Sequence, residues 1–270
     1  MKSKLIALDI DGTILDKPAG VPVPPSVREA IREARQAGAR VCLCTSRPCF
    51  YMQDATRDLD GVDALIGCSG AAIEIPKTPG ESRGELFFMD EIPYSLILAV
   101  FETAKRWDLH MSFALKEKLL VGRKGPVNPP RGDESVFSVM EDAELLAALR
   151  AAPVSSAFVF TAPGMPDSVV LEEESFAGAT IQRSTSNCFV ITNIGTDKGT
   201  GVMRLAKLWG IPREAVLAVG NDANDVPMLE AAGVGAAVAN ASPEAIAAAD
   251  LIVPDVREGG AADAIRRFAL

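Results

Sequence analysis

Two aspartates near the N-terminus have a spacing that suits metal-dependent chemistry. Asp9 and Asp11 stand two residues apart in the segment DIDGT, so in extended chain both carboxylates project to the same side, and Gly12 permits the turn that follows. Two acids this close repel each other unless a cation lies between them, and Mg²⁺ prefers such oxygen ligands. One carboxylate could attack phosphorus as a nucleophile while the other exchanges a proton with the leaving group and then with water. A D-x-D segment in isolation is more often a solvated turn at the end of a strand.

Three later segments carry polar side chains that could complete such a site. Thr45 supplies a hydroxyl, and free amides at the start of the helix after it could bind a phosphate oxygen. Lys198 begins a predicted helix, where a positive charge opposes the helix dipole, so binding phosphate and neutralising the carboxylates would explain its position. Four oxygen-bearing side chains follow a later apolar run within five residues: Asn221, Asp222, Asn224 and Asp225. Each segment alone is equally consistent with a helix cap, a surface lysine or a turn.

The elements that must position these residues alternate between strand and helix. Apolar runs at residues 5–8, 41–43 and 64–66 predict buried strands. Between the first two, Ser26 and Glu29 form a capping-box pattern, which predicts that a helix begins at Ser26. Runs that are apolar throughout indicate a parallel sheet covered by helices on both faces. In such sheets ligands bind outside the carboxyl ends of the strands, where we expect all four polar segments to lie.

The middle of the chain has a different texture, which predicts an inserted α+β domain. Strand-like pieces at 86–89 and 157–160 flank a helix predicted over 93–107. A Gly/Pro-rich loop is expected from Gly122 to Gly132.

The alternation of strands and helices returns at Phe189. It predicts helices and strands in turn as far as the C-terminus: helices at 198–209, 225–232, 243–249 and 259–268, and strands at 215–219, 234–238 and 251–253. The predicted fold class is therefore α/β, with a Rossmann-like, doubly wound parallel sheet core. We assign residues 1–78 and 188–270 to this core and residues 79–187 to the inserted α+β domain.

Composition argues against several other classes of function. The net charge of -9 and the pI of about 4.8 argue against nucleic-acid binding, which needs a basic face. No stretch is long enough to span a membrane, and the apolar run near the N-terminus is too short for a signal peptide. Five cysteines without a C-x-x-C pair favour reduced thiols in the cytoplasm over disulfides or a zinc knuckle. His110 is the only histidine, which excludes multi-histidine metal sites.

Taken together, the motifs resemble the haloacid dehalogenase superfamily, and within it the Cof-type phosphatases that carry a C2B-type cap domain. The resemblance covers nearly the whole chain. DIDGT is similar to the first motif of that family, while Thr45 lies at the second motif and Lys198 at the third. The segment GNDANDVPM resembles the fourth motif, usually G-D-x-x-N-D-x-x-M, and residues 233–252 resemble the sequence that follows it.

The resemblance implies a role for each matching residue. Asp9 would be the nucleophile that forms an aspartyl-phosphate, and Asp11 the general acid/base. Both would contribute to a Mg²⁺ site, Asp11 through its backbone carbonyl, with Asn221 and Asp225 as the remaining metal-site residues. Phosphate and substrate binding would fall to four residues: Thr45, Ser46, Lys198 and Asn224.

Three positions depart from the family pattern. Asn221 stands where the family has a metal-ligating aspartate; it offers a carbonyl oxygen but no charge, which predicts either weaker Mg²⁺ binding or a contribution from Asp222. Ser46 replaces the usual glycine of the second motif, and Ser69 replaces the asparagine of an N-G-A segment.

The function implied by the resemblance is Mg²⁺-dependent hydrolysis of small phosphate monoesters, such as sugar phosphates or similar metabolites. The expected partner is a small phosphorylated metabolite, with neither nucleic acid nor membrane. A phosphomutase of the same superfamily would keep the aspartyl-phosphate but return the phosphoryl group to a sugar. A non-catalytic phosphometabolite-binding protein, suggested by Asn221, would bind its ligand without hydrolysing it.

Overall fold

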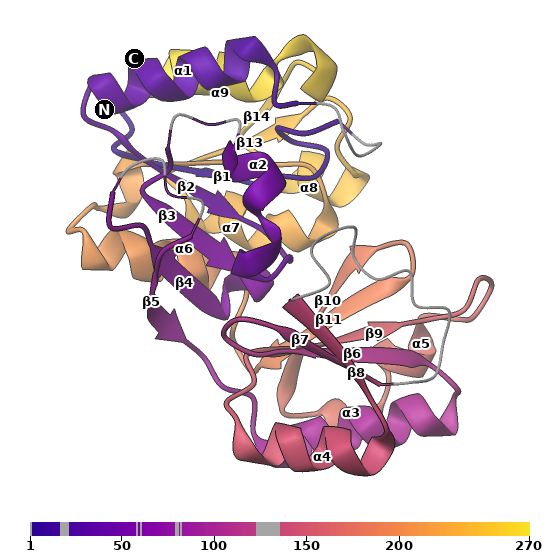
Figure 1. The fold of residues 1–270 in the computed structure, drawn as a ribbon. Coiled ribbons are helices and arrows are strands. Elements are labelled where there is room, and N and C mark those ends of the chain that lie inside the picture. The colour runs from indigo at the N-terminus through magenta and orange to yellow at the C-terminus, as the bar shows by residue number, and fades with distance from the viewer. Residues whose placement is uncertain are drawn as a thin grey trace. The chain divides into compact units, whose positions relative to one another are not determined.

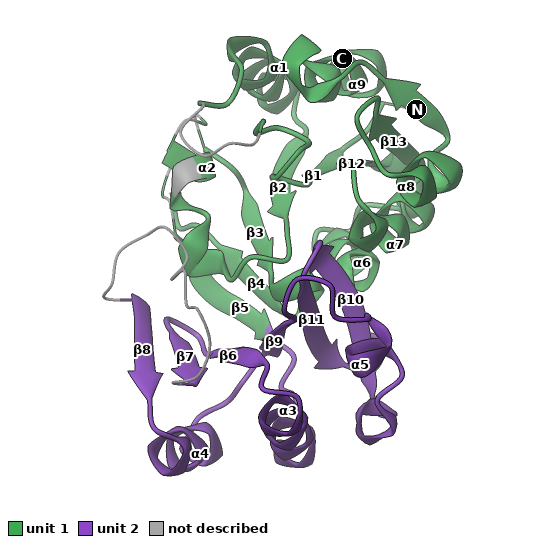
Figure 2. Ribbon diagram, turned by 90° about the vertical axis from the view of Figure 1, so that its right-hand side faces the viewer, with its two compact units in different colours: residues 1–88, 197–270 green, residues 89–196 purple. Residues whose placement is uncertain are grey.

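The computed structural model describes residues 2–16, 22–57, 59, 61–78, 81, 83–122 and 136–270. Apart from Gly122, the Gly/Pro-rich loop expected from Gly122 to Gly132 lies outside these residues. The chain divides into two compact units, which Figure 2 shows in green and purple. Unit 1 comprises Met1–Phe88 and Asp197–Leu270, and unit 2 comprises Met89–Thr196. The inserted segment thus begins and ends later than the predicted boundaries after residues 78 and 187.

The described part of unit 1 contains one sheet of eight strands. They are β1 (Leu5–Leu8), β2 (Arg40–Cys44), β3 (Ala64–Gly67), β4 (Ala72–Ile75), β5 (Glu85–Met89), β12 (Val216–Gly220), β13 (Val234–Val238) and β14 (Leu251–Val253). Their order is β14-β13-β12-β1-β2-β3-β4-β5. Every pair from β14 to β3 is parallel, and β4 is antiparallel to β3. The predicted parallel core is confirmed, with an antiparallel addition at one edge.

Helices cover both faces of this sheet, as Figure 1 shows. On one face α1 (Pro25–Gln36) and α9 (Gly260–Ala269) pack side by side over Ile6 and Leu8 of β1. On the other face α6 (Lys198–Leu208) and α7 (Val226–Ala231) pack over Leu5 and Ala7. Alternate residues of β1 therefore face different apolar clusters, which is why its sequence is apolar throughout. Two short helices complete the unit: α2 (Gln53–Arg57) and α8 (Pro243–Ala248).

The predicted start of α1 was wrong by one residue, and so was its capping box. The helix begins at Pro25, its N-cap is Pro24, and no side chain caps it. Ser26 therefore lies inside the first turn. Proline at the first helical position has a suitable φ and lacks an N–H that would need a partner, so this helix can start without a capping side chain.

In the residues that the structure describes, unit 2 combines a six-stranded sheet with helices, which agrees with the α+β prediction. Its strands are β6 (His110–Ala114), β7 (Leu119–Gly122), β8 (Phe137–Met140), β9 (Ser156–Phe160), β10 (Ala179–Thr185) and β11 (Cys188–Asn193), in the order β10-β11-β9-β6-β7-β8. The helices are α3 (Tyr94–Arg106), α4 (Asp142–Ala151) and α5 (Ser168–Leu171). Helices α3 and α4 lie next to each other in Figure 1 and in Figure 2. Residues of α3, α4 and the central strands form one apolar core.

Two strands lie in a different unit from the one that the sequence predicted. β11 was assigned to the core, but it pairs with β9 and β10 in unit 2. β5 was assigned to the inserted domain, but it lies at the edge of the unit 1 sheet. A short apolar run identifies a strand without identifying its sheet, because pairing partners are set by contacts distant in sequence.

The two ends of unit 2 are held to each other. The Asp90 carboxylate accepts a hydrogen bond from the side-chain amide of Asn193 at 3.1 Å and another from the hydroxyl of Thr196. The hydroxyl of Thr192 donates to the main-chain oxygen of Thr196 at 2.7 Å. Residues about a hundred positions apart in sequence are thereby joined where the insertion starts and ends.

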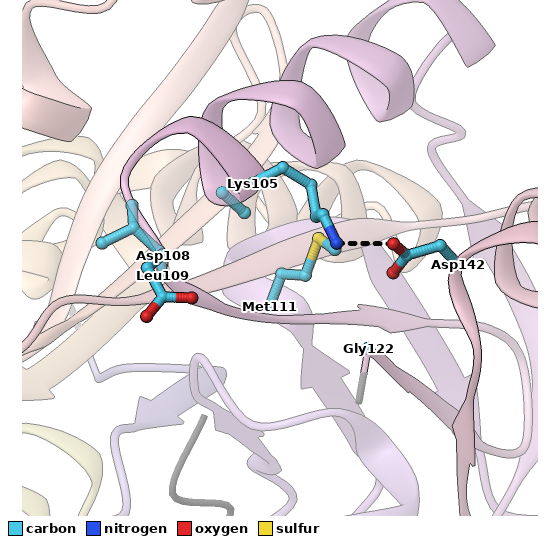
Figure 3. A pocket seen from close by; sticks show the side chains of 7 residues that line it. Lys105, Asp108, Leu109, Met111, Gly122 and Asp142 are labelled. Carbon is cyan, nitrogen blue, oxygen red and sulfur yellow. Dashed lines mark hydrogen bonds and ion pairs between the residues drawn. The ribbon is translucent and has the colours of Figure 1, made fainter. Parts of the chain in front are cut away.

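A small cavity in unit 2 lies beside an ion pair between Lys105 and Asp142, whose charged atoms are 2.5 Å apart (Figure 3). Its volume is about 30 Å³. That is room for water and too little for a metabolite. No helix in the described residues is long and apolar enough to cross a membrane.

Candidate active site

The fold brings the first and last polar segments together because the strand order reverses between β1 and β12. From β1 the chain continues to β2 and β3 on one side, while β12, β13 and β14 lie on the other. Such a reversal leaves a crevice at the carboxyl ends of the two central strands. Leu8 of β1 is paired with Val219 of β12, so Asp9 and Asn221 both emerge at this edge.

Lys198 is buried between two carboxylates. Its Nζ lies 2.8 Å from Oδ1 of Asp9 and 2.5 Å from Oδ1 of Asp225, and only 1% of its side chain is exposed. The other oxygen of Asp225 accepts the main-chain N–H groups of Asn221 at 2.8 Å and Asp222 at 3.0 Å. Both oxygens of Asp225 are thus engaged by the protein. Asp225 thus holds Lys198 and the loop that carries Asn221 in place beside Asp9.

The position of Lys198 is fixed by the start of α6. Asp197 is the N-cap, and its side chain accepts the main-chain N–H of Thr200 at 2.7 Å, while the Thr200 hydroxyl accepts that of Asp197 at 2.9 Å. This capping box makes Lys198 the first residue of the helix. The positive charge that opposes the helix dipole is compensated by two carboxylates.

The charges of this centre keep Lys198 protonated, and they would also favour a metal cation beside Asp9. Burial, reinforced by the charge of Asp225, raises the pKa of Asp9 to about 7, although Lys198 opposes the shift. Burial alone would lower the pKa of Lys198, but the charges of Asp225 and Asp9 outweigh it and raise that pKa above its ordinary value. Lys198 is therefore charged. A further cation beside Asp9 would favour its ionised, nucleophilic form.

The Asn221 amide lies close to two other oxygen-bearing groups, the Asp9 carboxylate and the main-chain carbonyl of Asp11, in a way that suits Mg²⁺. One terminal atom of the Asn221 amide lies 3.1 Å from Oδ2 of Asp9 and 3.0 Å from the main-chain oxygen of Asp11. Neighbouring oxygens of an octahedral Mg²⁺ shell, each about 2.1 Å from the ion, lie about 3.0 Å apart. The described residues contain no group of three His, Cys, Asp or Glu side chains placed to bind a metal. An ion here would therefore have one carboxylate and two neutral oxygens from the protein.

Gly12 allows this approach. Its φ is +88°, and a Cβ there would lie 2.5 Å from a terminal atom of Asn221. Any side chain at position 12 would push Asn221 away from Asp9. The Asp222 carboxylate caps its own turn by accepting the N–H of Ala223 at 2.8 Å.

Sequence reasoning missed a partner of Asp11. Arg47 Nε lies 2.7 Å from Asp11 Oδ2, and Arg47 Nη2 lies 2.5 Å from Asp11 Oδ1, which forms a two-pronged ion pair. A third contact runs from Arg47 Nη1 to the main-chain oxygen of Tyr51 at 3.2 Å. The available signal was its position: Arg47 directly follows Thr45 and Ser46 at the end of β2.

Two of the departures from the family pattern contact each other. The hydroxyls of Ser46 and Ser69 are 2.9 Å apart, and the side-chain amide of Asn224 donates to Ser46 Oγ at 2.8 Å. All three residues are buried. Ser69 has a φ of +52°, a conformation that asparagine adopts readily. Thr45 is also buried beside them, and its Oγ1 accepts the N–H of Arg47 at 3.3 Å.

Ser46→Ala is expected to lower the free energy of unfolding by about 1–3 kcal/mol, because two buried polar groups, on Ser69 and Asn224, would lose their partner. In a double-mutant cycle with Ser69→Ala, the two losses should fail to add, with a coupling of about 0.5–3 kcal/mol. Urea unfolding measures both quantities. Ser186→Ala, at an exposed turn, is the control. Additive losses would contradict the direct contact between the hydroxyls.

Comparison with known proteins identifies the family of this chain. The family model of the haloacid dehalogenase-like hydrolases matches residues 6–265. The phosphoglycolate phosphatase of Methanothermobacter thermautotrophicus is 28% identical over 267 residues, covering 98% of each chain.

Two solved structures share the fold over almost their whole length. The phosphatase BT1666 from Bacteroides thetaiotaomicron has a TM-score of 0.83 at 23% identity, covering 100% of this chain and 96% of that one. The subclass IIB sugar phosphatase BT4131 has a TM-score of 0.81 at 22% identity, covering 98% and 99%. The chain therefore belongs to the haloacid dehalogenase-like hydrolases, as an enzyme of their phosphatase group.

Proposed function

We propose that the protein hydrolyses small phosphate monoesters with the help of Mg²⁺, through an aspartyl-phosphate on Asp9. The observation that carries this proposal is the buried centre in which Lys198 bridges Asp9 and Asp225, while a terminal atom of the Asn221 amide lies close to both Asp9 Oδ2 and the Asp11 carbonyl oxygen. The names of related proteins, a phosphoglycolate phosphatase and a sugar phosphatase, support a small phosphorylated metabolite as substrate.

The first half of the reaction uses Asp9 as nucleophile. A carboxylate oxygen of Asp9 attacks phosphorus in line with the ester bond, and the bond to the leaving oxygen breaks. Asp11 takes part in this step in its protonated form: it donates that proton to the leaving oxygen, which departs as an alcohol, and Asp11 becomes a carboxylate. Lys198 neutralises charge on the transferring phosphoryl group. Thr45, Ser46 and Asn224 are the remaining groups proposed to bind phosphate or substrate.

The second half returns Asp9 to its starting state. Asp11, now a carboxylate, accepts a proton from water as the water attacks phosphorus. The bond between phosphorus and the Asp9 oxygen breaks, which releases inorganic phosphate. Mg²⁺ would be held by Asp9, the main-chain oxygen of Asp11 and Asn221, with Asp225 in support; it supplies additional charge neutralisation for the phosphoryl oxygens.

Phosphate release from an aryl phosphate and a panel of sugar phosphates tests this function. We expect release with Mg²⁺, loss of release in excess EDTA and recovery when Mg²⁺ is restored. Transfer of phosphate between positions of a sugar, stimulated by a sugar bisphosphate and with little free phosphate, would instead identify a mutase. Binding of sugar phosphates by a folded protein without turnover would contradict the hydrolase and support a binding protein.

Arg47→Lys is expected to lower kcat about tenfold with little change in KM, because lysine keeps the charge but cannot orient the Asp11 carboxylate through two parallel contacts. Stability should change little, since the Arg47 and Asp11 side chains are 26% and 25% exposed. Steady-state kinetics and thermal unfolding check both statements. Arg32→Lys on exposed α1 is the matched control. An equal loss of activity in both variants would argue against a positioning role.

We also infer a reducing, cytoplasmic location. All five cysteines are buried, and all are free thiols. They form no disulfide with one another, although several of them lie in the same unit, unit 1. Proteins of oxidising compartments more often use cysteines as disulfides.

A further inference from the structure

The Asn221 amide can be oriented in two ways, and the surroundings favour a different one depending on whether a cation is present. The terminal atom that approaches Asp9 and Asp11 also lies 3.0 Å from Oγ1 of Thr13. A main-chain carbonyl oxygen and an ionised carboxylate are acceptors only. An amide oxygen in this place would face two acceptors with nothing between them, whereas an amide nitrogen could donate one N–H to each.

We propose that Asn221 is a two-position residue of the metal site. Without a cation, its Nδ2 points inward and donates to Oδ2 of Asp9 at 3.1 Å and to the main-chain oxygen of Asp11 at 3.0 Å. When Mg²⁺ binds, the amide turns over and presents Oδ1 as a ligand. The inference rests on the proposed Mg²⁺ site and concerns how this chain fills that site without the ion.

The neighbours of Asn221 accept either orientation. Thr13 donates its hydroxyl hydrogen to Oδ1 when the oxygen points inward. When Nδ2 points inward, its two N–H groups go to Asp9 and Asp11, and the Thr13 hydrogen bond is given up. The remaining terminal atom lies against Gly12, where no side chain restricts it to nitrogen or oxygen. Turning the amide therefore exchanges one hydrogen bond, from Thr13, for two, to Asp9 and to the Asp11 main-chain oxygen.

An aspartate at this position could not behave in the same way. When the carboxyl groups of Asp9, Asp11 and Asp225 are all ionised, they carry three negative charges against the two positive charges of Lys198 and Arg47, so the net charge of the centre is -1. A fourth carboxylate would make it -2, and it would face Asp9 without a proton to donate. Asn221 thus stabilises the cation-free site and binds Mg²⁺ less strongly than aspartate would.

Replacing the side-chain nitrogen of Asn221 by oxygen tests both effects, on Mg²⁺ affinity and on the stability of the cation-free protein. Asn221→Asp is expected to bind Mg²⁺ at least about tenfold more tightly than the wild type in calorimetric titration of the full chain. In EDTA the variant should melt at a lower temperature than the wild type, so Mg²⁺ should raise its Tm by more. Asn187→Asp, at an exposed turn of unit 2, makes the same chemical change and should alter neither quantity.

The amide itself can be observed in the wild-type protein, so the test does not depend on the folding of one variant. With ¹⁵N-labelled asparagine, the Asn221 side-chain resonances are assigned by their absence from Asn221→Asp or Asn221→Ser. In EDTA their protons should exchange slowly with water, because both are held by buried acceptors. Saturating Mg²⁺ should shift these resonances and remove that protection.

The outcomes distinguish this inference from the proposed function. The proposal of two Asn221 orientations is wrong if Mg²⁺ binds but leaves the Asn221 amide resonances unchanged. It is also wrong if Mg²⁺ binds equally tightly to the wild type and to Asn221→Asp. In both cases the phosphatase proposal stands. If Mg²⁺ binds to neither protein, both proposals fail. Tighter binding by Asn221→Asp together with Mg²⁺-dependent loss of amide protection is the expected result.

Discussion

Asp9→Asn is expected to lower kcat for phosphate release by at least about 10³-fold, because the variant loses the nucleophile on which the phosphoryl group is held. Asparagine has nearly the same size, and its amide can still contact Lys198, so the protein should remain folded. Phosphate release from the best substrate of the panel, with saturating Mg²⁺, measures the effect. Rapid quenching of the wild type with a ³²P-labelled substrate should trap acid-stable protein-bound phosphate, and the variant should trap none.

The matched control for this change is Asp108→Asn in unit 2. Asp108 has a φ of +52°, which asparagine tolerates, and it lies outside the candidate site. Its activity should stay within a factor of about two of the wild type. Full activity in Asp9→Asn would show that phosphate leaves by direct attack of water, and the aspartyl-phosphate mechanism would be wrong.

Lys198→Met should reduce both activity and stability. Methionine fills a similar volume but removes the cation that lies between Asp9 and Asp225. Breaking a buried ion pair by removing one partner costs about 3–5 kcal/mol of unfolding free energy, because the remaining charges stay buried. Losing a positive charge beside the transferring phosphoryl group should lower kcat at least about 10²-fold. Urea unfolding and steady-state kinetics measure the two losses.

Two further variants show whether the charges are the cause. Lys207→Met makes the same change on the exposed side of α6 and should leave activity and stability close to those of the wild type. Asp225→Asn added to Lys198→Met removes one unpaired carboxylate, so it should recover part of the stability without restoring turnover. A stability of Lys198→Met equal to that of Lys207→Met would refute the proposed balance of charge.

Much of the core could be predicted because its strands are short, apolar and followed by polar residues. Strands β1, β13 and β14 have the predicted bounds, and the sheet places Asp9 and Asn221 together as expected, whereas Lys198 reaches Asp9 from the first turn of α6. The physical reason is that parallel strands all end at one edge of a sheet, so residues distant in sequence meet wherever their strands are neighbours.

Other features depend on contacts that a local pattern does not encode. Nothing in the sequence around β11 says that it pairs with β9, and the spacing of Asp11 and Arg47 gives no sign of their ion pair. The contact between Ser46 and Ser69 is not predicted by the sequence either, because each residue departs from the family pattern in a separate segment. The motif predicts a metal-site role for Asp225, but it does not indicate the hydrogen bonds by which this carboxylate holds Lys198 and the main-chain N–H of Asn221.

The bonds from Asp90 to Asn193 and Thr196 have a consequence for how such a chain can change through evolution. Because the insertion enters and leaves at one place, a gene could lose or exchange that segment and leave the host only a short gap to bridge. Recombination at these two points would replace the whole of unit 2 in one step, without disturbing the order of the strands in unit 1. The same hydrogen bonds thus mark where natural variation, or a designed chimaera, can most easily cut and rejoin the coding sequence.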